Sequence, residues 1–349
     1  MKRAVALGLA AVLLGFLIPA LAVRLGGSGR AQQADGQQTT QPGSSPTEAG
    51  EPEGTAPPQA GPVSEGSADG SMLLRVQMSD GMVSELPLDD YLTGVVLAEM
   101  PTSFQGEALK AQAVVSRTYT LRQMARNKHD TADICTDASC CQGWMSYEDY
   151  CAKEGEQVGN AGAEAAAQAV RETDGQVLTF EGKLIDATFF SCSGGRTEAA
   201  VEVWGTEIPY LQAVDSPGEE NAAHFTDTVS FSKEKFSQLI HSKAPEAALE
   251  GSPANWFGSV TATEGGGVGT LGIGGVVFAG KDLRSLLGLR STVFSIHVSE
   301  DQIIVETKGY GHRVGMSQYG AEAMAQAGSD YRTILLHYYQ GVDVADYFA

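Results

Sequence analysis

In the stretch Gly94-Val-Val-Leu-Ala-Glu-Met-Pro101, Glu99 is the one carboxylate within an almost uninterrupted apolar run. The stretch predicts the end of a helix, because the residue before a proline disfavours helical geometry. Asp89 or Asp90 can cap the start of that helix. A second, Ala-rich helix is predicted over about Gly106 to Arg126. Two consecutive helices are therefore predicted in this part of the chain.

The apolar setting of Glu99 predicts an unusual carboxyl group. Val95, Val96, Leu97 and Met100 should withdraw water from it and favour its protonated form. In the last turn of a helix, the negative end of the helix dipole also opposes ionisation. A carboxylic acid that stays protonated near neutral pH can donate a proton to a leaving group, so Glu99 is a candidate catalytic acid. The alternative is a half-buried structural carboxylate held by a nearby Arg or Lys.

The second helix carries polar side chains at helical spacing. Lys110 and Arg117 fall on one side of it, and Gln112 and Tyr119 fall on another. We expect these side chains to line a cleft.

The first fifth of the 349 residues does not resemble a globular domain. Lys2 and Arg3 precede an uncharged apolar stretch, 4–23, that is long enough to cross a hydrocarbon core of roughly 30 Å. The sequence predicts a cytoplasmic tip and transmembrane anchor over 1–25, with the rest of the chain exported. The segment Ala20-Leu21-Ala22 also resembles a cleavage site, so a removable signal peptide is the alternative.

A Pro-, Gly-, Ser- and Glu-rich linker is predicted over 26–71, because it has almost no large apolar residue to bury. The exported domain is then 72–349. The formal net charge of -20 argues against a nucleic-acid partner, which would favour basic stripes. Strands and helices do not alternate regularly in the domain, so the predicted fold is a single mixed α+β domain.

Two Gly-rich motifs are candidate binding segments. Ser191-Cys-Ser-Gly-Gly-Arg-Thr197 combines hydroxyl groups with bare backbone that a ligand could approach closely, and a plain Gly-rich turn is the alternative. The segment Gly309 to Ala321 places His312 and Gln318 in a loop that leads into a helix. His312 is either a ligand or proton carrier, or a histidine that braces the loop.

A cluster of soft ligands follows the second predicted helix: His129, Cys135, Cys140 and Cys141. Four such residues so close together predict a zinc site, which would be closed and structural because catalytic zinc keeps an open position. A disulfide between Cys135 and Cys141, or free thiols, are the alternatives in an exported protein.

Six segments together resemble the stage II sporulation protein D family, and the resemblance extends from about Met72 to the carboxyl terminus. The segments are Tyr91 to Pro101, Glu107 to Tyr119, Ser191 to Thr197, Val203 to Leu211, Leu283 to Ser291 and Gly309 to Ala321.

The resemblance implies a membrane-anchored lytic transglycosylase, a carbon-oxygen lyase that cuts peptidoglycan between N-acetylmuramic acid and N-acetylglucosamine without water. Glu99 matches the catalytic glutamate. It would protonate the glycosidic oxygen and then deprotonate the C6 hydroxyl, which closes a 1,6-anhydro ring. The candidate substrate-binding residues within these segments are Lys110, Arg117, Tyr119, Ser191, Ser193, Gly194, Tyr210, His312 and Gln318.

The resemblance also implies a zinc site at the Cys and His cluster, a preference for denuded glycan, and a place in the mother-cell membrane during forespore engulfment. Sporulation proteins M and P would be partners in a membrane complex there. Arg313 departs from the family pattern, which has glycine in its Gly-His-Gly form, and Cys192 replaces a small hydroxyl residue.

Relatives of this domain also act as non-catalytic wall-binding or amidase-enhancing proteins, so that function is the main alternative. A zinc-dependent peptidase or amidase is a second one, although Cys-rich ligation argues against it.

Overall fold

A computed structural model describes residues 66–299 and 302–349. All of them belong to one compact unit, Pro62–Ala349, which mixes helices with small sheets, as predicted for an α+β domain. No helix in the described ranges is both long and apolar enough to cross a membrane. The predicted anchor lies outside the described residues, as does most of the predicted linker.

The helices are a short 3₁₀ helix η1 (Asp69–Ser71), α1 (Leu88–Glu99), α2 (Gly106–Ala125), α3 (Tyr147–Glu154), α4 (Glu156–Glu172), α5 (Ala200–Trp204), α6 (Lys233–His241), the 3₁₀ helix η2 (Pro253–Asn255), α7 (Gly280–Leu287), α8 (Gln318–Gln326) and α9 (Tyr331–Tyr338). The strands are β1 (Leu73–Gln77), β2 (Val83–Pro87), β3 (Ile134–Cys135), β4 (Gln176–Phe180), β5 (Lys183–Leu184), β6 (Phe189–Phe190), β7 (Thr226–Ser232), β8 (Phe257–Ala262), β9 (Val268–Ile273), β10 (Val276–Ala279), β11 (Val293–Val298), β12 (Gln302–Lys308), β13 (Met316–Ser317) and β14 (Asp343–Asp346).

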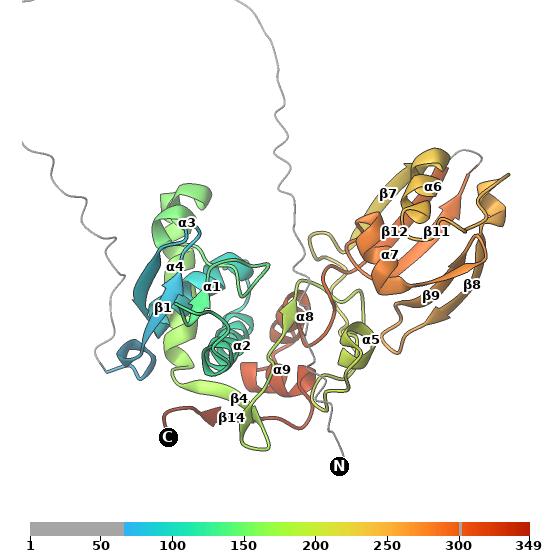
Figure 1. The fold of residues 1–349 in the computed structure, drawn as a ribbon. Coiled ribbons are helices and arrows are strands. Elements are labelled where there is room, and N and C mark those ends of the chain that lie inside the picture. The colour runs from blue at the N-terminus through green and yellow to red at the C-terminus, as the bar shows by residue number, and fades with distance from the viewer. Residues whose placement is uncertain (1–65, 300–301) are drawn as a thin grey trace, which may run out of the picture. The chain divides into compact units, whose positions relative to one another are not determined.

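The larger hydrophobic core surrounds α2, whose Ala- and Val-rich sequence is buried along most of its length. Helices α1, α4, α8 and α9 pack against α2, together with strand β4 (Figure 1). Small residues permit close contacts in this core. A Cβ on Gly94 of α1 would lie 2.2 Å from Nε1 of Trp144, so a glycine is needed where the Trp144 ring crosses the helix.

A smaller core lies within residues 226–305. Strands β11, β12 and β7 form one antiparallel sheet there, and β10, β9 and β8 form another. Helices α6 and α7 cover these strands (Figure 1), and the core between them is built around buried Phe236, Trp256 and Leu283.

The folded domain begins earlier than predicted. Asp69 lies within the predicted linker, yet its side chain is completely buried and pairs with Arg117 of α2 at 2.6 Å. Three donors from residues 67–69 also bond the Asp174 carboxylate. Residues 67–69 therefore form an ion pair and hydrogen bonds within the folded domain.

The prediction of α2 was confirmed, because the helix begins at Gly106 and ends one residue before the predicted end. Strands β1 and β2 form an antiparallel hairpin before it. The predicted cap of α1 was wrong. Pro87 occupies the N-cap position without a side-chain hydrogen bond, and Asp89 and Asp90 lie in the first helical turn. The short segments α3, α5, β10 and β14 were not predicted. Strand β14 pairs with the distant strand β4, whereas β10 forms a hairpin with β9 and α3 is capped by Ser146.

Candidate functional site

Glu99 is the last residue of α1, as predicted, and its side chain is partly exposed while its neighbours Leu97 and Met100 are buried. Burial raises the pKa of its carboxyl group, and a hydrogen bond from the Gly143 amide to Oε1, at 2.5 Å, opposes that shift more weakly. Among the described residues no Arg or Lys pairs with Glu99. The structure therefore does not support the alternative of a carboxylate held by a cation.

The late Gly-rich motif reaches the backbone of Glu99. The Gln318 carboxamide donates to the Glu99 carbonyl oxygen at 3.0 Å and to Oε1 of Gln112 at 3.3 Å. Gln112 in turn donates to Ser116, four residues further along α2. Gln318 was predicted to bind substrate, but its amide group holds the end of α1 against α2 and so fixes the position of Glu99.

The predicted metal ligands converge. The ligand atoms of His129, Cys135, Cys140 and Cys141 all lie within 4.8 Å of one another. Strand β3 positions Cys135 by pairing in parallel with β1, and Nε2 of His129 lies 3.2 Å from Sγ of Cys141. All five cysteines, which fall in the described part of the chain, are free thiols there.

The loop that carries Cys140 and Cys141 also carries Gly143, whose amide donates to Glu99. Gly143 follows Cys141 by two residues, and a Cβ at Gly143 would lie 3.0 Å from Oε1 of Glu99. Gln142 fixes the intervening backbone, because its amide donates to Oγ1 of Thr120 on α2 at 3.0 Å. The position of the loop therefore determines whether the Gly143 amide contacts the candidate acid.

Three residues of α2 were predicted to bind substrate, and the structure places them elsewhere. Arg117 is fully buried and holds Asp69 as well as the Val170 and Gln176 carbonyls, so it has no surface to offer a glycan. Lys110 forms ion pairs with Glu107 of its own helix and with Glu172 of α4. Tyr119 lies at the Cys cluster, with its hydroxyl group 3.5 Å from the Cys140 carbonyl oxygen.

The small-residue motif is organised by Glu219, a buried carboxylate that sequence reasoning missed. It accepts hydrogen bonds from the amides of Ser193 and Gly194 and from the hydroxyl groups of Ser193, Ser216 and Ser317. Ser193 and Gly194, which were predicted to bind substrate, thus bind this internal carboxylate. Ser191 contributes its carbonyl oxygen to the Tyr319 amide at 3.0 Å, so the two Gly-rich motifs contact each other.

The contacts of Arg313 account for an arginine at a position where the family pattern has glycine. Its φ of +68° lies in the left-handed region that favours glycine. Its guanidinium group is buried and donates to the carbonyl oxygens of Ser193, Arg196 and Gly265, and it lies 3.5 Å from the Glu198 carboxylate. These hydrogen bonds offset the backbone strain at Arg313. They also connect the late Gly-rich motif to Gly265, which lies in the segment 226–305 that contains the smaller core.

His312 and Tyr210 also have internal partners. Nδ1 of His312 accepts from the Val314 amide at 3.1 Å, and burial, aided by the charge of Arg284, lowers the pKa of the imidazole to about 4. His312 is therefore neutral near pH 7 and braces its loop. Of the two hypotheses drawn from the sequence, this favours a bracing histidine over a ligand or proton carrier. Tyr210 accepts from the Asp186 amide at 3.1 Å.

Comparisons with known proteins agree with the sequence motifs. The family model described as "Stage II sporulation protein" matches residues 77–180, which include Glu99 and the Cys cluster. The stage II sporulation protein D of Bacillus amyloliquefaciens is 38% identical, over 77% of this chain and 77% of its own length. That of Bacillus subtilis is 37% identical over 76% of each chain.

The amidase enhancer of Bacillus subtilis is 30% identical, over 73% of this chain and 40% of its own length. The sporulation proteins match over most of both chains and at higher identity. The chain belongs to the stage II sporulation protein D family.

Proposed function

We propose that this protein is a lytic transglycosylase that cuts peptidoglycan between N-acetylmuramic acid and N-acetylglucosamine during sporulation. Family membership supports a sporulation-related role on peptidoglycan. The observation that carries the finer proposal is Glu99, a partly exposed carboxyl group with a raised pKa and no cationic partner among the described residues.

One carboxyl group suffices for this reaction. Protonated Glu99 donates its proton to the glycosidic oxygen as the bond from that oxygen to C1 breaks. The resulting carboxylate then accepts the proton of the C6 hydroxyl as its oxygen bonds to C1, which gives a 1,6-anhydro end and regenerates the acid. Hydrolysis by two carboxylates would instead need a second catalytic group across the bond.

The other buried carboxylates have structural partners. Asp69 pairs with Arg117, Glu198 pairs with Arg313, and Glu219 accepts from surrounding serines and amides. Glu322 accepts from the Gln105 amide and from the Gln326 carboxamide. None of the four is available to act with Glu99 as a second catalytic carboxylate, which supports a single acid and base.

The test is product analysis of denuded glycan strands by mass spectrometry. Wild type should release anhydro-muropeptides, and Glu99→Gln should release none while it still folds and binds glycan. Glu322→Gln is a matched control, since Glu322 is a buried glutamate on α8 that accepts from the Gln105 amide. Wild-type product levels from Glu99→Gln would contradict the proposal.

A non-catalytic role is the second candidate, because a relative at 30% identity is an amidase enhancer. In that case purified protein would leave glycan strands intact and would stimulate a separate amidase. A Glu99→Gln variant that retains full stimulation of the amidase, from a protein with no cleavage of its own, would favour this candidate.

We also propose that the Cys and His cluster holds one structural zinc ion. Two observations support it: the ligand atoms lie within 4.8 Å of one another, and the donor set of three sulfurs and one imidazole suits tetrahedral zinc. Zinc would supply a rigid cross-link to the loop that ends at Gly143. Elemental analysis should find about one zinc per chain, and a native Cys135 to Cys141 disulfide would overturn this.

We further propose that the domain works outside the cytoplasm on a single N-terminal membrane anchor, in the engulfing mother-cell membrane, with sporulation proteins M and P as partners. Protease protection in cells and co-purification from membranes test these two statements.

A further inference from the structure

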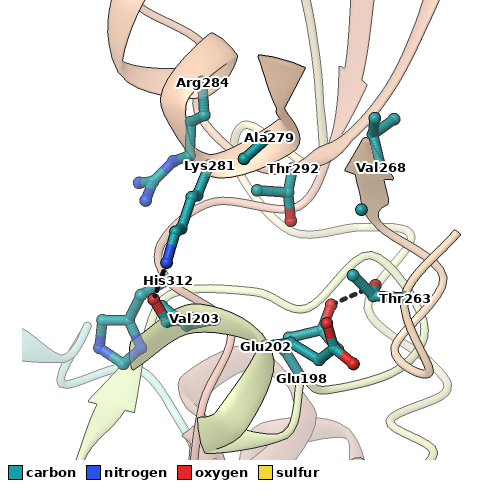
Figure 2. A pocket seen from close by; sticks show the side chains of 11 residues that line it. Glu198, Glu202, Val203, Thr263, Val268, Ala279, Lys281, Arg284, Thr292 and His312 are labelled. Atoms are coloured by element: carbon teal, nitrogen blue, oxygen red, sulfur yellow. Dashed lines mark hydrogen bonds between the residues drawn. The ribbon is translucent and has the colours of Figure 1, made fainter. Parts of the chain in front are cut away.

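A pocket whose lining does not include Glu99 lies where α5 and the late Gly-rich loop face α7 (Figure 2). It is a cavity of about 70 Å³. Its wall combines cations with small apolar and hydroxyl side chains, among them Lys281, Arg284, Val203, Ala279, Thr292 and His312. The volume suits one substituent of a sugar and excludes a whole sugar ring.

The charges in this pocket favour an anion. Glu198 is neutralised by Arg313 and accepts from the Thr263 hydroxyl and the Gly265 amide. Lys281 donates to the Val203 carbonyl oxygen at 3.2 Å and pairs with no carboxylate among the described residues. Arg284 lies beside Lys281 on the same helix (Figure 2) and lines the pocket; its Nε donates to the Arg290 carbonyl oxygen at 3.2 Å, and its charge contributes to the lowered pKa of His312. Glu202, at the exposed rim, is the remaining acid.

An aromatic platform borders the pocket. Trp204 is 41% exposed, and its ring lies 5.6 Å from the ring of His312, which lines the cavity. A large indole surface left open to solvent beside a polar pocket is a common feature of ligand sites, because the ring offers contact area at a low entropic cost. The apolar face of a sugar ring has the size and chemistry to cover it.

A continuous set of contacts connects this platform to Glu99. The His312 ring lies 5.7 Å from the Phe190 ring, and Phe190 pairs with Ser317 between β6 and β13. The next residue, Gln318, holds the end of α1 at Glu99. The platform is therefore connected, through the buried residues Phe190, Ser317 and Gln318, to the helix end that carries Glu99.

We propose that Trp204, Lys281 and Arg284 form an accessory glycan subsite, in which a sugar ring covers the indole and its carboxylate substituent enters the cavity between the two cations. The inference rests on the proposed function, because it takes the ligand to be a second unit of the same strand. A free carboxylate on a muramic acid unit fits both the volume and the charge. An amidated carboxyl group, as in a unit that carries a peptide, has no charge and is too large.

The experiment measures binding by calorimetry in a Glu99→Gln background, so that no ligand is cleaved. The ligands are soluble glycan oligosaccharides with free muramic carboxylates and the same oligosaccharides as methyl esters. Lys281→Gln should weaken binding of the acid form about tenfold and leave the ester unchanged. Trp204→Ala should weaken binding of both forms about fivefold.

Matched controls are Lys183→Gln, an exposed lysine on β5, and Tyr347→Ala, an exposed aromatic residue near the carboxyl terminus. Both should bind as the parent does, and unchanged melting temperatures should show that all variants fold. Equal affinity of parent and Lys281→Gln for the acid form would overturn the subsite. If the binding pattern holds but wild type makes no anhydro product, the subsite stands and the proposed reaction fails.

Discussion

The ion pair between Asp69 and Arg117 gives a prediction about where the domain begins. Both side chains are completely buried, and Asp69 accepts from Nε and Nη2 of Arg117 at 2.7 and 2.6 Å. Asp69→Ala leaves a buried guanidinium without its counter-ion. Loss of one partner of a buried pair costs about 3–5 kcal/mol, so we expect the urea midpoint of the domain 62–349 to fall by about 1 M or more.

Two further variants separate the pair from its surroundings. A chain that starts at Met72, the predicted boundary, lacks Asp69 and should lose about as much stability as Asp69→Ala. The double variant Asp69→Leu with Arg117→Met removes both charges, and it should recover most of the loss because similar apolar residues often replace a buried pair at little cost.

Equilibrium urea unfolding followed by circular dichroism measures all of these variants. A cost below about 1 kcal/mol for Asp69→Ala, which is the range of exposed pairs, would refute the reasoning. Binding of denuded glycan by the folded double variant tests the role of Arg117 directly. Retained affinity would confirm that Arg117 is structural, and lost affinity would restore it as a substrate ligand.

Other predictions concern Glu99 and the elements around it. Because burial raises the pKa of Glu99, cleavage should persist above the ordinary glutamate range and fall as pH rises through that pKa, in a pH-rate profile. The protonated acid also stabilises the fold at low pH, so wild type should lose stability relative to Glu99→Gln as pH rises through the same pKa, in denaturation series. Chelation should lower the melting temperature and change Trp144 fluorescence, since Trp144 adjoins Gly143. Gly94→Ala should cost about 1–3 kcal/mol in urea unfolding, because its Cβ would overlap Trp144.

The sequence was most informative where local pattern decides structure. The apolar run around Glu99 and the proline after it were enough to place this carboxyl group in the last turn of α1, with a raised pKa. The spacing of the Cys and His residues likewise anticipated their convergence, although strand β3 and its parallel pairing were not predicted.

Sequence reasoning failed where a polar residue is buried by partners far along the chain. Arg117 and Ser193 have the composition of ligand-binding residues, yet their partners are Asp69 and Glu219, which lie 48 and 26 residues away. Nothing local to Glu219 shows that it is buried. Arg313 did carry a signal, because a bulky residue in place of a motif glycine indicated that something must offset its strain.

The central claim is that Glu99 alone serves as acid and base in non-hydrolytic glycan cleavage, and its most direct test is the mass of the product ends. Purified wild-type protein on denuded strands should yield 1,6-anhydro ends, lighter by one water than hydrolysed ends, and Glu99→Gln should yield neither. Reducing ends from wild type, or anhydro ends from Glu99→Gln, would contradict the account.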